Sequence, residues 1–307
     1  ILGRILAREL KEVLTQCERP AILELGAGSG KLAESILEAL DLETDLRPEY
    51  RILETSADLR DRQMSRLSSF EGRVRWLDTL DTDFEGAIVA NEVMDALPVT
   101  RFSRSADTVC ALGVGLAGDR FDWSEQLAGP GLSAHVESLE ALVGGRFPEG
   151  YRSEFCRSLP AWISSLSDVL RRGAIWLIDY GLVEREYYHP LRTDGTLVCH
   201  YRHRAHADPF LHPGLQDISA WVDFSACART AHAESLKVAG FSTQGQFLVE
   251  GGALELLSQI GGALDLRETQ AFKTLVMPGE MGERFKVLLL TREVESVLPG
   301  RDLRDRL

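Results

Sequence analysis

The sequence predicts an α/β fold: a doubly wound, mostly parallel sheet with an insertion and a long lid loop. A short apolar run, Ala21–Leu25, leads directly into a glycine-rich turn, and the next residues have the apolar spacing of a helix. Strand-like and helix-like segments then alternate, and Ala174–Ile178 is apolar throughout, as expected of a strand buried in a parallel sheet. Such alternation predicts parallel strands with helices on both faces of the sheet.

The elements follow from apolar periodicity and from glycine and proline punctuation. The predicted helices are 2–14, 32–40, 57–67, 159–170, 254–260 and 267–275, and the predicted strands are 21–25, 51–55, 74–77, 86–90, 174–178, 242–249 and 286–291, with a hairpin within 109–123. Gly173 is expected to cap the helix that begins at Leu159. The charged tail Arg301–Leu307 is expected to fray.

These elements predict three regions. Residues 1–98 are expected to form the N-terminal half of a Rossmann-like core. Residues 99–158, which are glycine-rich and weakly periodic, are expected to form an insertion or cap over the site. Residues 159–307 complete the core and include a polar lid loop at 182–223, which is long for a compact fold.

Composition excludes several classes of protein. In these 307 residues no apolar run approaches the length of a bilayer span, and the net charge of −13 argues against nucleic acid as a partner. That charge suits a cationic substrate or simple solubility.

The five scattered cysteines form no CxxC pair and favour a reducing cytoplasm, or a mitochondrion if the source is eukaryotic. Because the sequence starts at Ile1 without a Met, a targeting peptide remains compatible with it. Nothing in it indicates an oligomeric state.

The turn after the first predicted strand has the form E-x-G-x-G-x-G, with glycines at Gly26, Gly28 and Gly30. Glycines let the backbone turn sharply and let a ligand approach where a Cβ would collide. A P-loop is excluded because Leu25 and Leu32 stand where that motif needs Gly and Ser or Thr. A dinucleotide site and an S-adenosylmethionine (SAM) site are the remaining alternatives.

Acidic residues beside the turn favour SAM. Glu24 lies within the strand, where a carboxylate would repel a pyrophosphate but attract the ammonium and sulfonium of SAM. Glu54 closes the second strand, where it can accept hydrogen bonds from both ribose hydroxyls. Asp78 follows the third strand and is a candidate for the adenine amino group, although a turn-forming role explains it equally well.

Three polar residues follow the fourth predicted strand, at the edge where doubly wound sheets bind their ligands. Asn91, Glu92 and Asp95 lie within five residues, and a helical turn would place Glu92 and Asp95 on one side. Two carboxylates could hold a guanidinium and accept its proton, and we expect these three residues to be catalytic. The alternative is that Asn91 and Asp95 are helix caps.

The chain resembles the MidA family of SAM-dependent methyltransferases. The likeness rests on I-L-E-L-G-A-G-S-G (22–30), A-N-E-V-M-D-A-L-P-V (90–99), L-I-D-Y-G (177–181) and further motifs at 53–56, 187–206, 213–225, 240–248 and 277–288. It implies a class I methyltransferase fold and SAM as cofactor. It also implies a protein arginine acceptor, such as a respiratory complex subunit, and a further N-terminal segment with a Gly-Asp-Phe motif that this sequence does not contain.

A histidine-rich stretch within the predicted lid invites a metal interpretation, with His200, His203, His206, His212 and Cys199 as candidates. A closed zinc site needs four converging ligands, and the interleaved Arg202 and Arg204 would oppose a cation, so no metal is expected. Two other functions remain open: a SAM-fold assembly factor that binds a partner protein without turnover, and a small-molecule N- or O-methyltransferase.

Overall fold

The computed structural model describes residues 1–202, 204–259 and 266–307. The chain forms two compact units. The first unit contains Ile1–Val93, Ala161–Tyr180 and Cys227–Leu307, and the second contains Met94–Pro160 and Gly181–Ala226. Within the described ranges, no helix combines the length and the apolar character that crossing a membrane requires.

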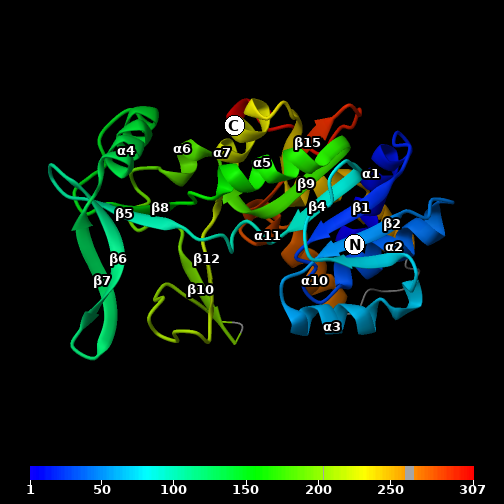
Figure 1. Ribbon diagram of the computed structural model, residues 1–307, viewed down its shortest axis with the longest axis horizontal. Helices are drawn as coiled ribbons and strands as arrows, with labels where there is room; N and C mark the ends of the chain where they lie inside the picture. Colours follow the sequence, from blue (N-terminus) through cyan, green and yellow to red (C-terminus); the bar gives the residue numbers. More distant parts are fainter. Residues whose placement is uncertain (203, 260–265) are drawn as a thin grey trace. The chain divides into compact units, whose positions relative to one another are not determined.

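The first unit is built on a twisted, mostly parallel sheet (Figure 1). Its strands lie in the order β14 (Lys237–Thr243), β15 (Phe285–Arg292), β9 (Leu170–Leu182), β4 (Phe84–Asn91), β1 (Ala21–Leu25), β2 (Glu49–Leu53) and β3 (Val74–Leu77). The pairs from β9 to β3 are parallel, whereas β15 is antiparallel to both of its neighbours. The predicted α/β class is confirmed, and the strand order reverses between β1 and β4, where such sheets bind ligands.

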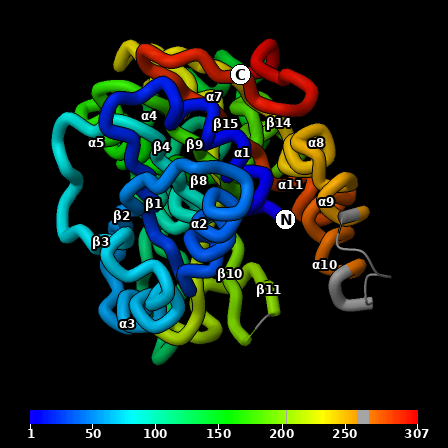
Figure 2. The backbone as a smooth tube through the Cα atoms, turned by 90° about the vertical axis from the view of Figure 1, so that its right-hand side faces the viewer, coloured from blue at the N-terminus to red at the C-terminus, as the bar shows by residue number. Residues whose placement is uncertain are grey.

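Helices cover the sheet with apolar stripes. One apolar cluster joins alternate strand residues, such as Ile22 and Trp176, to Leu10 of α1 (Leu2–Leu14) and Leu37 of α2 (Lys31–Glu43). The cluster extends into α8 (Gln244–Glu250) and α9 (Ala253–Gln259). Figure 2 shows α8 beside α9 and α10 (Leu266–Val276). The remaining helices of the unit are α3 (Ala57–Arg66), α11 (Met281–Arg284) and most of α5 (Leu159–Val169) and α7 (Phe224–Ala233).

The second unit has an antiparallel sheet and its own core. The sheet order is β7 (Arg120–Leu127), β6 (Val109–Ala117), β5 (Thr100–Arg104) and β8 (Arg152–Phe155). Its apolar cluster includes Phe102, Phe147 and Tyr151, and it draws on α4 (Pro130–Val143) and α6 (Glu184–Tyr187). A smaller sheet contains β11 (Arg204–His206), β10 (Val198–Tyr201) and β12 (Asp217–Ser219), and β13 (Val222–Asp223) pairs with Gly181 and Leu182.

Several sequence predictions were wrong in detail. Residues 244–249 of the predicted strand 242–249 are helical, because the Thr243 hydroxyl accepts from Gln246 N and begins α8. Gly173 caps no helix: α5 ends at Val169, and Gly173 lies inside β9 with φ +139°. A Cβ there would overlap the carbonyl of Gly86, so glycine permits the close approach of β9 to β4.

The predicted lid loop is not a loop throughout: the described residues of 182–223 contain a helix and four strands. The predicted insertion 99–158 contains α4, which weak periodicity concealed. The tail is anchored as well, since Leu303 is buried and its N–H donates to Phe241 O at 2.8 Å. Ile260, the last residue of one predicted helix, lies outside the described residues.

Candidate cofactor and acceptor site

The turn after β1 has a backbone that requires glycine. Gly26, Gly28 and Gly30 have φ values of +62°, +53° and +76°, which side-chain-bearing residues rarely adopt. Gly26 N donates to Leu53 O at 2.9 Å, and Gly30 N donates to Ala27 O at 2.8 Å, so the turn is fixed against β2 and against itself. A Cβ on Gly28 would meet no atom within 4 Å. The turn therefore borders open space, as a cofactor lying against its backbone requires.

Glu24 is a buried carboxylate beneath this turn. It is 2% exposed, and its Oε2 accepts from the Tyr50 hydroxyl at 2.7 Å. Burial raises the pKa of Glu24 to about 7, the hydrogen bond from Tyr50 opposes that rise, and the nearby charge of Glu54 adds to it. Near neutral pH the carboxylate is thus poised between its neutral and charged forms, and a cation arriving beside it would favour the charged form.

Glu54 follows β2 and is 9% exposed. Its Oε1 accepts from Ser56 N at 3.0 Å, and its Oε2 accepts from Gln63 Nε2 at 3.0 Å. Both donors are neutral, so neither bond brings a positive charge to Glu54. A two-oxygen acceptor held in one orientation suits the recognition of neighbouring hydroxyls.

Asp78 lies where β3 ends, but it is strongly exposed. Its side chain is 88% accessible, and Oδ1 accepts from Arg60 at 2.9 Å. Arg60 also donates to Leu77 O at 2.9 Å, which ties the end of β3 to α3. The contact of Asp78 with adenine stays a prediction.

The turn after β4 places Asn91 and Glu92 beside the glycine turn. Glu92 has φ +54°, and its N–H donates to Ile178 O at 3.0 Å. The Asn91 amide donates to Glu92 Oε1 at 3.2 Å. Val93 lies against Gly26, because a Cβ on that glycine would be 3.2 Å from Val93 Cγ2. No helical turn forms here: the chain leaves β4 through a left-handed residue, and this replaces the expected helical placement of Glu92 and Asp95.

Asp95 belongs to the second unit. It is 9% exposed, and Ala220 N donates to its carbonyl oxygen at 3.0 Å. Burial raises the pKa of its carboxyl, while a hydrogen bond with Ser219 and the charge of His200 oppose that rise. Asp95 is therefore held within a polar cluster of its own unit.

The histidine-rich stretch forms part of the small sheet. The ring of Tyr201 lies 4.2 Å from that of His212, centroid to centroid, and the guanidinium of Arg202 lies 5.3 Å from the Tyr201 ring centroid. Among the residues that the structure describes, no three His, Cys, Asp or Glu side chains are grouped so as to hold a metal ion. His203 lies outside those residues.

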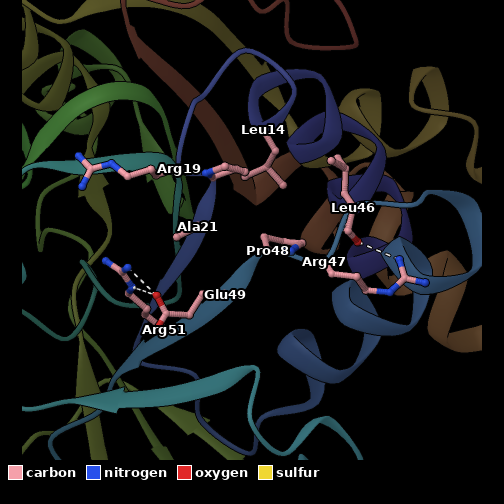
Figure 3. A pocket seen from close by; sticks show the side chains of 9 residues that line it. Leu14, Arg19, Ala21, Leu46, Arg47, Pro48, Glu49 and Arg51 are labelled. Carbon is pink, nitrogen blue, oxygen red and sulfur yellow. Dashed lines mark hydrogen bonds and ion pairs between the residues drawn. The ribbon is translucent and has the colours of Figure 1, made fainter.

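The opposite, amino-terminal edge of the same strands has a cavity of about 340 Å³. It is lined by Leu14, Arg19, Pro20, Ala21, Leu46, Arg47, Pro48, Glu49 and Arg51 (Figure 3). Figure 3 shows the Arg51 guanidinium turned toward Glu49, and Arg51 also pairs with Asp81 at 3.1 Å. The charges at this edge compensate one another, which is typical of a structural ion-pair network.

Four residues of the first unit were missed by sequence reasoning. Tyr50 binds Glu24, Gln63 and Trp76 form a chain that reaches Glu54, and Asp179 Oδ2 accepts from Val93 N at 3.2 Å. Only Asp179 had a sequence signal, because it is an acidic residue directly after the apolar strand Ala174–Ile178. The other three are ordinary residues of a strand or helix, whose roles depend on the tertiary fold.

A mostly parallel sheet with a glycine turn at its switch point and a carboxylate after the next strand is the arrangement of a Rossmann-like nucleotide-binding fold. The buried Glu24 beside the turn favours SAM over a dinucleotide. Comparison with known proteins agrees. Residues 1–242 match the model of a family described as S-adenosyl-L-methionine-dependent methyltransferases. The chain belongs to this family, and its cofactor is SAM.

Solved structures and a curated relative support the same assignment. A likely methyl transferase from Burkholderia thailandensis bound to S-adenosyl-homocysteine is 36% identical, with a TM-score of 0.89 over 98% of this chain and 80% of that one. A native structure from the same organism is 36% identical, with a TM-score of 0.88 over 98% and 82% of the two chains. A Caenorhabditis elegans protein, the mitochondrial protein arginine methyltransferase NDUFAF7 homolog, is 24% identical over 91% of this chain and 70% of its own length. The MidA-like resemblance is confirmed.

Proposed function

We propose that this methyltransferase modifies a protein side chain, and that the acceptor is an arginine guanidinium. SAM supplies the methyl group from its sulfonium. In this proposal the backbone of Gly26, Gly28 and Gly30 lies against the cofactor, Glu24 attracts its cationic end and Glu54 accepts from its ribose hydroxyls. Asp78 is the proposed partner of the adenine amino group.

One observation carries the cofactor part of the proposal. Glu24 and Glu54 are both buried, and their hydrogen bonds from described residues all come from neutral donors. A buried carboxylate without a cationic partner costs free energy, and that cost is recovered when a ligand supplies the positive charge. SAM is such a ligand, whereas a dinucleotide would bring a pyrophosphate anion to the same turn.

The acceptor part rests on the turn after β4. Glu92 is exposed, follows the strand next to β1 and is oriented by Asn91. A guanidinium is always protonated at neutral pH, so it needs a carboxylate to orient it and to accept a proton when the methyl group is transferred. We assign that role to Glu92, with Asn91 orienting it and Asp95 as a further acceptor-side carboxylate. The net charge of −13 favours approach of a cationic peptide.

A protein acceptor is supported by the C. elegans relative, which carries the name of a protein arginine methyltransferase. The MidA resemblance makes a subunit of a respiratory complex the first acceptor to test. That partner would present an arginine in an accessible segment, because a guanidinium buried in an ion pair could not enter the site.

Labelled SAM tests the proposal directly. The purified protein is incubated with methyl-labelled SAM and an extract of cells that lack the gene, and arginine methylation is mapped by mass spectrometry. Methyl groups on one or a few protein arginines are expected with wild type and not with Glu92→Gln. Label confined to low-mass products would overturn the proposal in favour of a small-molecule methyltransferase. No label, together with full rescue of the gene deletion by Glu92→Gln, would overturn it in favour of a non-catalytic assembly factor.

A further inference from the structure

A buried amide lies between two parts of the cofactor site. Gln63 is the one residue of α3 that is buried, with 0% of its surface exposed. Its Nε2 donates to Gly28 O at 2.9 Å and to Glu54 Oε2 at 3.0 Å. The first acceptor belongs to the glycine turn after β1, and the second is the carboxylate after β2. One side-chain amide therefore joins two segments that are separate in sequence.

The orientation of this amide is set by its third neighbour. Trp76 Nε1 donates to Gln63 Oε1 at 2.9 Å. An indole N–H is only a donor, so the atom facing it must be the amide oxygen, and the amide nitrogen must face Gly28 and Glu54. A flipped amide would place its oxygen against a carboxylate and a carbonyl. The three bonds thus form a chain in which each member fixes the next.

The neighbours of Gln63 on α3 hold the same edge of the sheet. Arg66 Nε donates to Ser29 O at 2.9 Å, and Arg60 donates to Leu77 O at 2.9 Å. Residues 60, 63 and 66 are spaced by three and so share one side of the helix. α3 consequently contacts the ends of β1, β2 and β3 through three donating side chains, and the central one, Gln63, also accepts from Trp76 of β3.

We propose that Gln63 is the positioning residue of the SAM site, which sets the glycine turn and the Glu54 carboxylate in register before the cofactor arrives. This proposal rests on the proposed roles of Gly28 and Glu54. The Gln63 amide holds one oxygen of Glu54, so the other oxygen and the remaining lone pairs keep one direction. Preorganised acceptors bind a ligand without the cost of ordering them first.

A double-mutant cycle tests the coupling, with SAM affinity measured by calorimetry and no turnover required. The variants are Gln63→Leu, Glu54→Ala and the double change. Gln244→Leu is the matched control: Gln244 is also buried, at 1% exposure, and donates to Leu275 O, but it follows β14, four strands away from β1. Melting temperatures of all variants are measured in parallel.

We expect Gln63→Leu to weaken SAM binding about 10- to 100-fold, as loss of a hydrogen bond to a charged group does. The double variant should bind within about fivefold of Glu54→Ala, because residues that act through one another are not additive. Gln244→Leu should lower the melting temperature and leave SAM affinity unchanged. Fully multiplicative losses, or equal affinities for Gln63→Leu and Gln244→Leu, would overturn the role of Gln63. An unaffected Glu54→Ala would instead overturn the assignment of Glu54 itself.

A second variant covers the case in which Gln63→Leu does not fold. Gln63→Glu keeps the volume and, when ionised, sets a carboxylate against Glu54 and the Gly28 carbonyl, with Arg60 and Arg66 the charged neighbours on α3. When protonated, the introduced carboxyl can donate to one of these acceptors again. Wild type and Gln63→Glu both lose the charge of Glu24 as pH is lowered from about 8 to about 6, so the ratio of wild-type to Gln63→Glu affinity for SAM isolates the introduced carboxyl and should become smaller over this range. A variant whose pH profile parallels that of wild type would contradict the proposal.

Discussion

The two ends of the same parallel strands differ in whether their carboxylates have cationic partners. At the amino-terminal edge Glu49, Asp81 and Glu85 face guanidinium groups, and Arg51 and Arg75 each contact both Glu49 and Asp81. At the carboxyl-terminal edge Glu24 and Glu54 are more deeply buried than Glu49, yet the described residues that donate to them are a phenol, a backbone amide and a side-chain amide. At the amino-terminal edge the carboxylates are neutralised by guanidinium groups. At the carboxyl-terminal edge we expect a ligand to supply the positive charge.

The comparison shows why a cavity is not by itself a functional site. Both edges have carboxylates, and the cavity lies at the amino-terminal edge, where its walls carry charged side chains (Figure 3). Compensated ion pairs near a surface contribute little to stability, and they leave no net charge that would favour binding of a charged ligand. Uncompensated carboxylates that are buried are costly, and they persist where binding recovers the cost.

The largest effect is expected from Glu92→Gln, which removes the proposed proton acceptor. Turnover should fall by about 10²- to 10⁴-fold, while the SAM dissociation constant should stay within about twofold. Glu293 offers a matched control, because it also follows a strand with a left-handed backbone, φ +55° against +54° for Glu92, but at the amino-terminal edge. Methylation kinetics should be normal for Glu293→Gln; equal losses in both variants would show that strain, and not chemistry, explains the effect.

The second prediction compares the two ends of β2. Glu54→Ala should weaken SAM binding by about 1.5–3 kcal/mol, or about 10- to 150-fold, because ribose hydroxyls lose a charged acceptor. Glu49→Ala changes the same residue type at the other end of the same strand and should leave SAM affinity unchanged. Calorimetry measures the SAM dissociation constant of both variants. A larger loss of SAM affinity in Glu49→Ala than in Glu54→Ala would contradict our assignment of the cofactor site to the carboxyl-terminal edge.

The third prediction concerns pH. The pKa of Glu24 is about 7 in the folded protein, against an ordinary value of 4.5. Between these values the folded state binds more protons than the unfolded state, so the free energy of unfolding falls as pH rises through this window. Glu24→Gln removes the ionisation and should stabilise the cofactor-free protein above pH 7 by about 1–3 kcal/mol. Chemical denaturation at several pH values measures this slope.

Glu24→Gln should also weaken SAM binding. If Glu24 attracts the cationic end of SAM, wild-type binding should strengthen as pH rises from about 6 to about 7.5, and Glu24→Gln should lose that dependence. Parallel pH profiles for the two proteins would leave Glu24 with a structural role only.

The smallest effect is expected from Asp81→Asn at the amino-terminal edge. Its ion pairs with Arg51 and Arg75 are partly exposed, at 22–51% of the side-chain surface of the arginines and 36% for the aspartate. Solvent and salt screen such pairs, so the free energy of unfolding should fall by at most about 1 kcal/mol. SAM affinity should not change. A loss of SAM binding in this variant would show that the two edges are coupled.

Much of the first unit could be predicted because its signals are local. Apolar periodicity located α1 and the buried strands, and the positive φ values of the glycine turn followed from three glycines in five residues. The wrong predictions arose where tertiary contacts decide. The sequence predicts a helix cap at Gly173, whereas its actual role is a close approach to Gly86, a contact between strands far apart in sequence.

The hydrogen bonds that support the site could not be predicted from the sequence, because they too depend on tertiary contacts. α3 has a strongly polar sequence, A-D-L-R-D-R-Q-M-S-R, and nothing in it distinguishes Gln63 from its neighbours. Its burial depends on Gly28, Glu54 and Trp76, which come from three other segments. Sequence reasoning therefore located the residues proposed to face the ligand and missed those that support them.

The interleaving of the two units has a consequence for biosynthesis. The first unit is completed by segments that begin at Ala161 and Cys227, so β4 leaves the ribosome well before β9, its partner in the sheet. Until then β4, which is buried along nearly its whole length, presents an unpaired apolar edge. Nascent chains that stop between β4 and β9 are consequently the species most prone to aggregate, and a chaperone acting on this protein would find its target there.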